Sequence, residues 1–232
     1  MNIIITGASR GIGFETALQL CKDGHRVIAV ARTGKGLERL QAAASAAGVD
    51  KQLMILPVDI SSEKDIQELV FTSKSLDGKL DVLINNAGLL LNKPFVSISP
   101  EELRKVYEVN VFAPFRLIQA LKPLLEGGHI VNISSMGGVQ GSSKFPGLSA
   151  YSSSKAALAN LSELLAEELK DNKIRVNCLA LGATQTEMLA EAFPGYEAPL
   201  SAAEMARWIA WFAVNGQKFF NGKILPVAVS TP

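Results

Sequence analysis

The feature that most constrains the fold is a regular alternation of apolar, β-rich runs with helical stretches. The runs are continuously apolar, as expected for strands buried on both faces of a sheet. Strands that alternate with helices predict βαβ units with right-handed crossovers. We therefore expect one doubly wound α/β domain over residues 1–232, with a seven-stranded, mostly parallel sheet. The expected strands are Ile3–Thr6, Arg26–Ala31, Leu53–Val58, Val82–Asn85, Ile130–Ile133, Ile174–Ala180 and Ile224–Val229.

Charge and composition exclude several classes of protein. The formal net charge of +1 lacks the basic excess that binds a phosphate backbone, so we expect no nucleic-acid partner. No apolar run reaches the roughly 18 residues of a membrane span, and the chain does not begin with a signal-peptide pattern. We expect a cytoplasmic protein without a membrane partner, in which Cys21 and Cys178 are buried thiols. His25 and His129 have no further ligands at metal-binding spacing, so we expect no metal site.

Two helices are clearly marked. Ser99-Pro100-Glu101-Glu102 combines a capping serine, a proline suited to the first turn and a glutamate that completes a capping box. The longest expected helix is Tyr151–Lys170, which carries an apolar stripe at helical spacing.

A glycine-rich segment joins the first expected strand to the first helix. Glycines let a backbone approach a pyrophosphate closely, and a helix start offers free N–H groups and partial positive charge. The spacing differs from G-x-G-x-x-G, and a purely structural glycine turn is the alternative. The position between strand and helix favours a Rossmann-type dinucleotide site. Its expected cofactor-binding residues in this loop are Gly7, Ser9, Arg10, Gly11, Ile12 and Gly13.

The end of the second strand indicates the type of cofactor. A free ribose 2′-hydroxyl usually meets an acidic residue there, whereas a 2′-phosphate favours arginine. This chain has Arg32 at that position and Arg10 in the glycine loop, and two guanidinium groups can bind one phosphate. An ordinary solvated charge is the alternative interpretation of Arg32. We predict NADP(H) rather than NAD(H).

Two further strand ends complete the expected cofactor site. Asp59, followed by Ile60, comes after the third strand and can accept a hydrogen bond from the adenine amino group. An acid at a helix start is the alternative interpretation. Asn86, Ala87 and Gly88 follow the fourth strand, where small residues let the chain pass close to a ribose. A plain Asn/Gly turn fits the same residues.

A second set of residues is suited to proton transfer. Tyr151 and Lys155 stand one helical turn apart, and Ser134-Ser135 come directly after the apolar run of the fifth strand. A carbonyl that receives hydride gains negative charge on oxygen, so a site must supply a proton and hydrogen bonds there. Lys155 is expected to lower the pKa of Tyr151 from about 10 toward neutrality. Lys155 can also bind the nicotinamide ribose hydroxyls, so Tyr151 and Lys155 are expected to contact the cofactor as well. Asn110, poorly suited to its helical stretch, can bend that helix and hold a water that passes protons to Lys155.

Together these segments resemble the short-chain dehydrogenase/reductase family in its small, single-domain form. The resemblance implies Tyr151 as catalytic acid/base, Lys155 as its activator, Ser135 as the residue that orients the substrate and Asn110 as a proton-relay residue. The matching segments are Thr6–Gly13, Asp59, Asn85–Gly88, Asn110, Ile130–Ser135, Tyr151–Lys155 and Gly182–Thr186.

The resemblance also implies that Gly182, Thr184 and Thr186 lie at the nicotinamide, with the carboxamide held near the two threonines. The chain departs from the family where Leu181-Gly182 replaces the usual Pro-Gly. The loop between Ser135 and Tyr151 is also longer than usual. By its position in the motif, Ser135 rather than Ser134 is expected to face the carbonyl.

A short substrate lid is expected at residues 187–200, which contain no Lys or Arg that could bind a carboxylate or phosphate. We therefore predict interconversion of a carbonyl and an alcohol on a small to medium, mostly uncharged molecule. Packing within loops is the alternative role for the apolar side chains there. Those expected at the pocket are Leu89, Leu90, Met136, Met188, Leu189, Phe193 and Tyr196.

Two other functions stay open. One is 3-oxoacyl-[acyl-carrier-protein] reductase, although Glu126 lies where such reductases tend to be basic toward an acidic carrier. The other is an NADP-binding regulatory or scaffold protein without catalysis, which has no need of a phenol–ammonium pair. The resemblance implies a homodimer or homotetramer, with the helices around Asn110–Leu125 and Tyr151–Lys170 at the dimer face.

Overall fold

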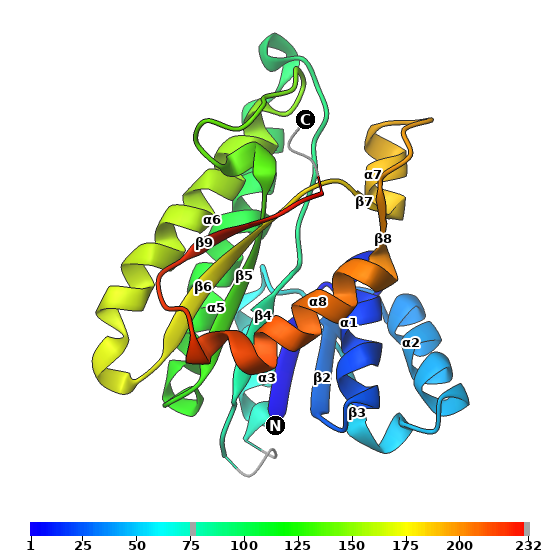
Figure 1. Ribbon diagram of the computed structural model, residues 1–232, viewed down its shortest axis with the longest axis vertical. Coiled ribbons are helices and arrows are strands. Elements are labelled where there is room, and N and C mark those ends of the chain that lie inside the picture. Colours follow the sequence, from blue (N-terminus) through cyan, green and yellow to red (C-terminus); the bar gives the residue numbers. More distant parts are fainter. Residues whose placement is uncertain (75–77, 230–232) are drawn as a thin grey trace.

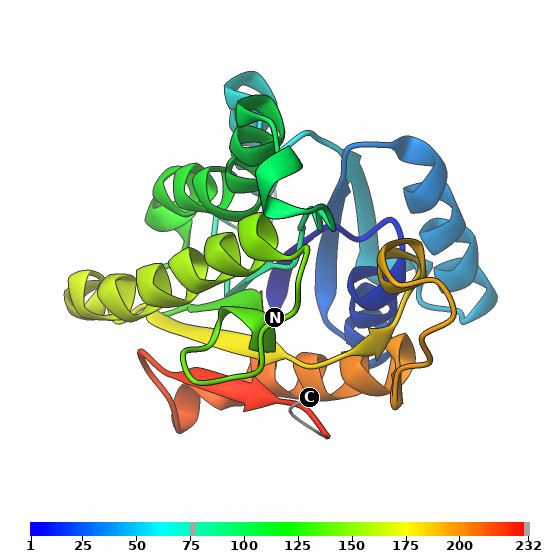
Figure 2. The ribbon, with the colours of Figure 1, turned by 90° about the horizontal axis from the view of Figure 1, so that it is seen from above.

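The computed structural model describes residues 1–74 and 78–229, which form a sheet between two layers of helices (Figure 1, Figure 2). The strands of the sheet are β1 Asn2–Thr6, β2 Arg26–Ala31, β3 Leu53–Pro57, β4 Val82–Asn85, β5 His129–Ser135, β6 Arg175–Leu181 and β9 Ile224–Val227. They pair in the order β3-β2-β1-β4-β5-β6-β9, and every pairing is parallel. The predicted doubly wound, seven-stranded sheet is confirmed.

The helices connect these strands. The capping box predicted at Ser99 is confirmed, because Ser99 Oγ accepts the Glu102 N–H at 3.2 Å while the Glu102 carboxylate accepts the Ser99 N–H at 2.8 Å. The α-helices are α1 Gly11–Lys22, α2 Gly34–Ala46, α3 Glu63–Ser73, α4 Pro100–Tyr107, α5 Ala113–Leu121, α6 Ser149–Glu168, α7 Glu187–Ala192 and α8 Ala202–Asn215. Short 3-10 helices span Asp50–Gln52, Phe95–Ser97, Lys122–Leu124, Met136–Gly138, Lys170–Asn172 and Gly216–Lys218.

Two hydrophobic cores lie on the two faces of the sheet. Side chains alternate along a strand, so Ile3 and Ile5 of β1 enter one core and Ile4 enters the other. Helices α1, α2 and α8 cover the first face, and α3, α5 and α6 cover the second (Figure 2). Burial on both faces explains why the strands are continuously apolar. None of the described helices is both long and apolar enough to cross a membrane.

The order of the sheet predicts where a ligand binds. The direction in which successive strands are added to the sheet reverses between β1 and β4, which are parallel neighbours although two strands separate them in sequence. Ligands of such sheets bind beyond the carboxyl ends of the strands at this reversal. The structure also contains a small parallel sheet that the sequence did not predict, formed by β7 Thr184–Gln185 and β8 Leu200–Ser201 (Figure 1). It joins the two ends of the segment that holds α7.

Candidate active site

The loop between β1 and α1 fits tightly against the segment after β4. Gly7 and Gly11 have φ angles of 70° and 57°, which glycine adopts without strain. A Cβ on Gly13 would lie 2.3 Å from both Asn86 Nδ2 and the Gly7 carbonyl oxygen. The Asn86 amide instead donates to the carbonyl oxygens of Thr6 at 2.9 Å and Gly7 at 3.3 Å. The glycines thus let this loop, which we call the glycine cradle, pack closely against the segment after β4 at the start of α1.

A cavity of about 400 Å³ opens beside this loop and is lined by four cationic side chains, Arg10, Arg32, Lys35 and Arg39. Arg10 and Arg32 are the two arginines singled out in the sequence. Lys35 and Arg39 were missed, because they lie on α2 rather than in a strand-end loop. Their spacing of four residues puts them on one face of that helix, directly after Arg32, and is the signal that could have found them. We call this group the basic cavity.

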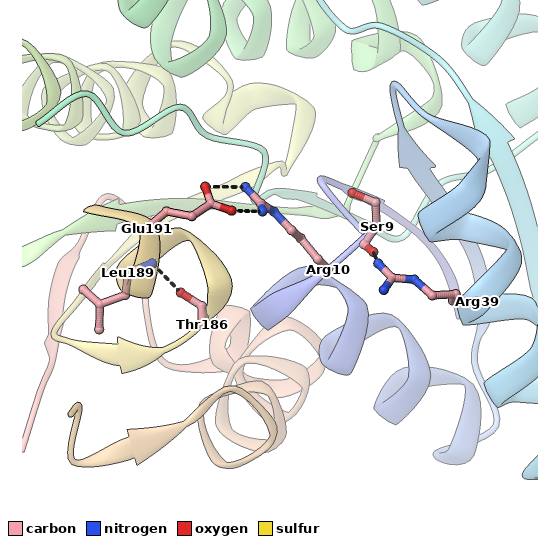
Figure 3. Close-up of polar contacts among 6 residues, drawn as sticks. All are labelled: Ser9, Arg10, Arg39, Thr186, Leu189 and Glu191. Atoms are coloured by element: carbon pink, nitrogen blue, oxygen red, sulfur yellow. Dashed lines mark hydrogen bonds and ion pairs between the residues drawn. The ribbon is translucent and has the colours of Figure 1, made fainter. Parts of the chain in front are cut away.

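Arg10 is already paired within the protein. Its guanidinium forms a two-pronged ion pair with Glu191 on α7, with N–O distances of 2.6 and 3.4 Å (Figure 3). This pairing raises the pKa of Arg10 and lowers that of Glu191. Arg39 Nη2 donates to the Ser9 carbonyl oxygen at 3.4 Å (Figure 3). The two arginines predicted to bind one phosphate together are therefore not both available, because Arg10 is paired with Glu191.

Asp59 and Ile60 line the main cavity, which lies at the carboxyl ends of the strands and has a volume of about 620 Å³. Asp59 Oδ1 accepts the Ser61 N–H at 2.9 Å, and the Asp59 N–H donates to the Asp65 carboxylate at 2.9 Å. Asp59 thus stabilises the start of α3 while it forms part of the cavity wall. Ala87 and Gly88 line the same cavity.

Tyr151 and Lys155 lie in the first two turns of α6 and face the main cavity. Lys155 Nζ is 5.9 Å from the centre of the Tyr151 ring and donates to the Ile133 carbonyl oxygen at 2.8 Å. A Cβ on Gly88 would lie only 3.3 Å from Lys155 Nζ, so glycine leaves room for the ammonium group. The fold therefore brings the phenol and the ammonium into the cavity that the glycine loop, including Ile12, also lines.

Burial shifts the pKa of both groups. It raises the pKa of Tyr151 to about 12, and a hydrogen bond with Ser135 offsets a smaller part of that rise. It lowers the pKa of Lys155 to about 8, an effect opposed by the nearby Cys178. The predicted lowering of the Tyr151 pKa is therefore wrong for this structure. A phenolate loses solvation here, and the ammonium group, itself buried and engaged with a carbonyl oxygen, does not compensate for that loss.

Two adjacent hydroxyl groups end β5. Ser134 is buried and donates to the Lys155 carbonyl oxygen at 2.8 Å. Ser135 is half-buried, and its Oγ accepts the Gly137 N–H at 3.3 Å. Of the two, Ser135 is the hydrogen-bond partner of Tyr151. This difference follows from the alternation of side chains along a strand.

Asn110 lies in a π-helical segment, Glu108–Phe112, between α4 and α5. The predicted bend of the helix stays a prediction. The Asn110 side chain is fully buried. Its Oδ1 accepts the Leu89 N–H at 2.8 Å. Its Nδ2 donates to the Leu89 carbonyl oxygen at 3.0 Å and to Ser154 Oγ at 2.9 Å. Pro114 has no N–H to donate to the Asn110 carbonyl four residues earlier, which favours the interruption. The amide connects the segment after β4 to α6, and the proton-relay role stays a prediction.

Gly182, Thr184 and Thr186 follow β6 and line the main cavity. A Cβ on Gly182 would lie 2.6 Å from Ala228 Cβ, so the packing after β9 requires this glycine. Thr184 Oγ1 donates to the Gly182 carbonyl oxygen at 3.4 Å. Thr186 Oγ1 accepts the Leu189 N–H at 3.2 Å and so caps α7 (Figure 3). That the threonines bind a carboxamide stays a prediction.

The apolar side chains expected at the pocket line the main cavity, including Leu90, Met136, Met188 and Tyr196. The cavity also includes Phe145 from the long loop after β5, which sequence reasoning missed because loop residues show no periodicity. In residues 1–74 and 78–229, no group of three or more His, Cys, Asp or Glu side chains is arranged to hold a metal ion.

The profile of the short chain dehydrogenase family matches residues 1–197. The Pseudomonas aeruginosa protein named rhamnolipids biosynthesis 3-oxoacyl-[acyl-carrier-protein] reductase is 34% identical over 243 residues, which cover 97% of this chain and 93% of that protein. The structure of 3-ketoacyl-(acyl-carrier-protein) reductase from Brucella melitensis complexed with NADH superposes with a TM-score of 0.86 at 28% identity, over 97% of this chain and 96% of that one. The structure of ElxO with NADP bound gives a TM-score of 0.84 at 26% identity, with the same coverage of 97% and 96%.

Proposed function

We propose, since this chain belongs to the short-chain dehydrogenase/reductase family, that it reduces carbonyl groups on small to medium, mostly uncharged molecules with NADPH. The observation that carries this proposal is that Tyr151, Lys155 and Ser135 share one cavity with the glycine loop. A proton donor beside a dinucleotide cradle suits hydride transfer between a nicotinamide and a carbonyl.

The residues present fit a dinucleotide. The glycine cradle lines the main cavity at the start of α1, where a pyrophosphate would bind. Asp59 and Asn86 line the same cavity and would face the adenosine and ribose parts. The basic cavity offers Arg32, Lys35 and Arg39 for a 2′-phosphate, beside Arg10, which is paired with Glu191, and no acidic residue ends β2. Because the similar structures include one with NADH and one with NADP, the preference for NADP(H) rests on this cavity.

The cofactor preference can be tested by binding alone. Arg32→Ala and Arg39→Ala are expected to weaken NADP⁺ binding by about tenfold each while leaving NAD⁺ binding unchanged, since a charge-assisted contact to phosphate contributes on the order of 1.5–3 kcal/mol. Calorimetric Kd values for both nucleotides measure this, with the exposed Lys51→Ala as control. Equal affinity of the unaltered protein for NAD⁺ and NADP⁺ would contradict the preference.

Each side chain has a distinct task in the proposed reaction. A reduced nicotinamide held in the main cavity would supply the hydride for the carbonyl carbon. Tyr151, which keeps its proton at neutral pH because its pKa is about 12, donates that proton to the carbonyl oxygen. Lys155, whose Nζ lies 5.9 Å from the ring centre, offsets part of the charge of the resulting phenolate. The Ser135 hydroxyl donates a hydrogen bond to the substrate carbonyl oxygen. Asn110 positions the segment at Leu89 against α6.

One conservative substitution distinguishes the proposed enzyme from an NADP-binding regulatory protein without catalysis. Tyr151→Phe removes the proton donor and keeps the ring, so turnover is expected to fall by about a hundredfold or more. NADPH affinity, followed by fluorescence, is expected to stay the same. If the unaltered protein oxidises no NADPH above background with a panel of ketones and aldehydes, the binding-protein alternative is favoured instead.

A carrier-bound substrate is the second candidate within this chemistry. It is supported by the names of similar proteins, which include 3-oxoacyl-[acyl-carrier-protein] reductases. The charge of Glu126 carries no weight against it, because Glu126 precedes β5 and so lies at the amino end of the sheet, whereas the cavity lies at the carboxyl ends. Turnover of acetoacetyl thioesters compared with simple ketones under NADPH distinguishes the two.

We further propose a homodimer or homotetramer in the cytoplasm, with residues 187–200 as the substrate lid. Phe112, Phe115 and Leu164 are exposed on the segments expected at the dimer face, which supports association there. The buried free thiols Cys21 and Cys178 fit a reducing compartment. Light scattering measures the assembly, and a monomer at micromolar concentration would contradict it.

A further inference from the structure

Arg10 connects the two cavities. It lines both the main cavity and the basic cavity, and its guanidinium is turned toward α7, where Glu191 binds it through two N–O contacts (Figure 3). Glu187, at the start of α7, adds a favourable electrostatic interaction with Arg10. The segment that carries these acids contains no Lys or Arg. Arg10 therefore lies between a cationic wall and an acidic helix.

The ion pair is exposed enough to exchange. The side chain of Arg10 is 43% exposed and that of Glu191 is 64% exposed. Arg10 makes no side-chain capping bond to α1, so its guanidinium can turn without breaking the helix start. A carboxylate and a phosphate present the same paired oxygen acceptors to a guanidinium. Glu191 thus occupies Arg10 in the manner that a phosphate would.

We propose that Glu191 tunes cofactor preference by competing with the ribose 2′-phosphate of NADP(H) for Arg10. This inference rests on the proposed function, since it requires that the 2′-phosphate enters the basic cavity. Three side chains of the basic cavity form no ion pair with α7 and can bind the 2′-phosphate directly: Arg32, Lys35 and Arg39. Arg10 can bind the 2′-phosphate only if its ion pair with Glu191 breaks. NAD⁺ lacks the 2′-phosphate, so it does not compete with Glu191 for Arg10.

The experiment compares two lid carboxylates. Glu191→Gln removes the charge that binds Arg10, while Glu197→Gln removes an equal charge from an exposed lid position that has no recorded partner among the described residues. We expect Glu191→Gln to tighten NADP⁺ binding about two- to fivefold, the range of an exposed ion pair, with NAD⁺ binding unchanged. We expect Glu197→Gln to change neither Kd. Calorimetry at low ionic strength gives the four values.

A double-mutant cycle ties the effect to Arg10. In the Arg10→Gln background, Glu191→Gln is expected to leave NADP⁺ affinity unchanged, because the contested guanidinium is gone. The inference is overturned if Glu191→Gln weakens NADP⁺ binding, tightens both nucleotides equally, or acts equally in both backgrounds. If the unaltered protein shows no preference for NADP⁺ over NAD⁺ and the basic-cavity variants change nothing, the proposed cofactor itself is wrong. If the unaltered protein clearly prefers NADP⁺ and Glu191→Gln does not change that preference, the competition by Glu191 is ruled out while NADP(H) remains the proposed cofactor.

Discussion

At the residue scale, Lys155 shows how a site suited to catalysis lowers stability. Its ammonium group is buried, with one carbonyl oxygen as its recorded hydrogen-bond acceptor. The folded protein holds the proton less tightly than the unfolded chain, since the pKa falls from 10.5 to about 8. Carrying the charge at pH 7 therefore costs free energy of folding, and this cost is relieved as pH rises from about 8 to 10.5.

Lys155→Met is accordingly expected to abolish turnover and to stabilise the protein at pH 7. The gain in unfolding free energy is expected to be about 2–3 kcal/mol at most, from the size of the pKa shift. Urea unfolding at pH 7 and pH 9.5 measures it, and the gain should be smaller at the higher pH. A variant that is less stable than the unaltered protein at pH 7 would show that the bond to Ile133 outweighs the burial of charge.

The residues that the sequence predicts well are those joined by local geometry. Tyr151 and Lys155 share a helix face because they stand four residues apart, and Ser135 ends a strand whose position the pattern predicts. The direction of the Tyr151 pKa was missed, because burial depends on what the rest of the fold packs around the phenol. The Arg10–Glu191 pair was missed for the same reason, as its partners stand 181 residues apart.

At the element scale, Pro114 and the π-helical segment before it place Asn110. A regular helix would carry Asn110 away from Leu89 and Ser154, which its amide joins. Pro114→Ala restores the missing N–H donor and favours a regular turn. We expect kcat to fall by about tenfold or more through misplacement of the site, with thermal stability unchanged or higher.

Stability and kcat measured together test this expectation. Pro123→Ala, in a short 3-10 helix distant in sequence from Asn110, is a control that removes a proline without touching the π-helical segment. If Pro114→Ala leaves kcat unchanged, other packing holds the π-helical segment in place. An amide hydrogen-exchange experiment on Glu108–Phe112 reports directly whether the segment changed.

The elements themselves were largely predictable. The seven strands end within two residues of their expected bounds, because continuous burial gives each a clear apolar run. The small sheet of Thr184–Gln185 and Leu200–Ser201 was missed, because two residues are too few to show any periodicity. The structure of the lid was missed with it.

At the scale of the whole molecule, His129 joins the sheet to the helix layer that contains α8. It is fully buried, with Nδ1 2.9 Å from the Ala213 carbonyl oxygen and Nε2 3.0 Å from the Asn177 amide. Burial lowers its pKa to about 4, so the folded protein keeps the ring neutral. In the unfolded chain the His129 ring becomes protonated below about pH 6.5. In the folded protein it becomes protonated only below about pH 4.

We therefore expect the protein to lose up to about 3 kcal/mol of stability from this residue as pH falls from 6.5 to 4. His129→Gln should flatten that part of the pH profile while lowering stability at pH 7. His25→Gln, which replaces the other, less buried histidine, serves as control and should leave most of the slope in place. Chemical unfolding at several pH values measures both, and identical slopes for the two variants would argue against His129.

The pairing of Thr184 with Leu200 and of Gln185 with Ser201 has a consequence for how such enzymes diverge. It joins the two ends of the segment proposed as the lid, so the residues between them form a closed loop. The length of this loop does not affect the main sheet. Doubling the length of such a loop costs only about 0.6 kcal/mol of closure entropy. Insertions in this closed loop can therefore reshape one wall of the main cavity, while Tyr151, Lys155 and the strands of the main sheet keep their places.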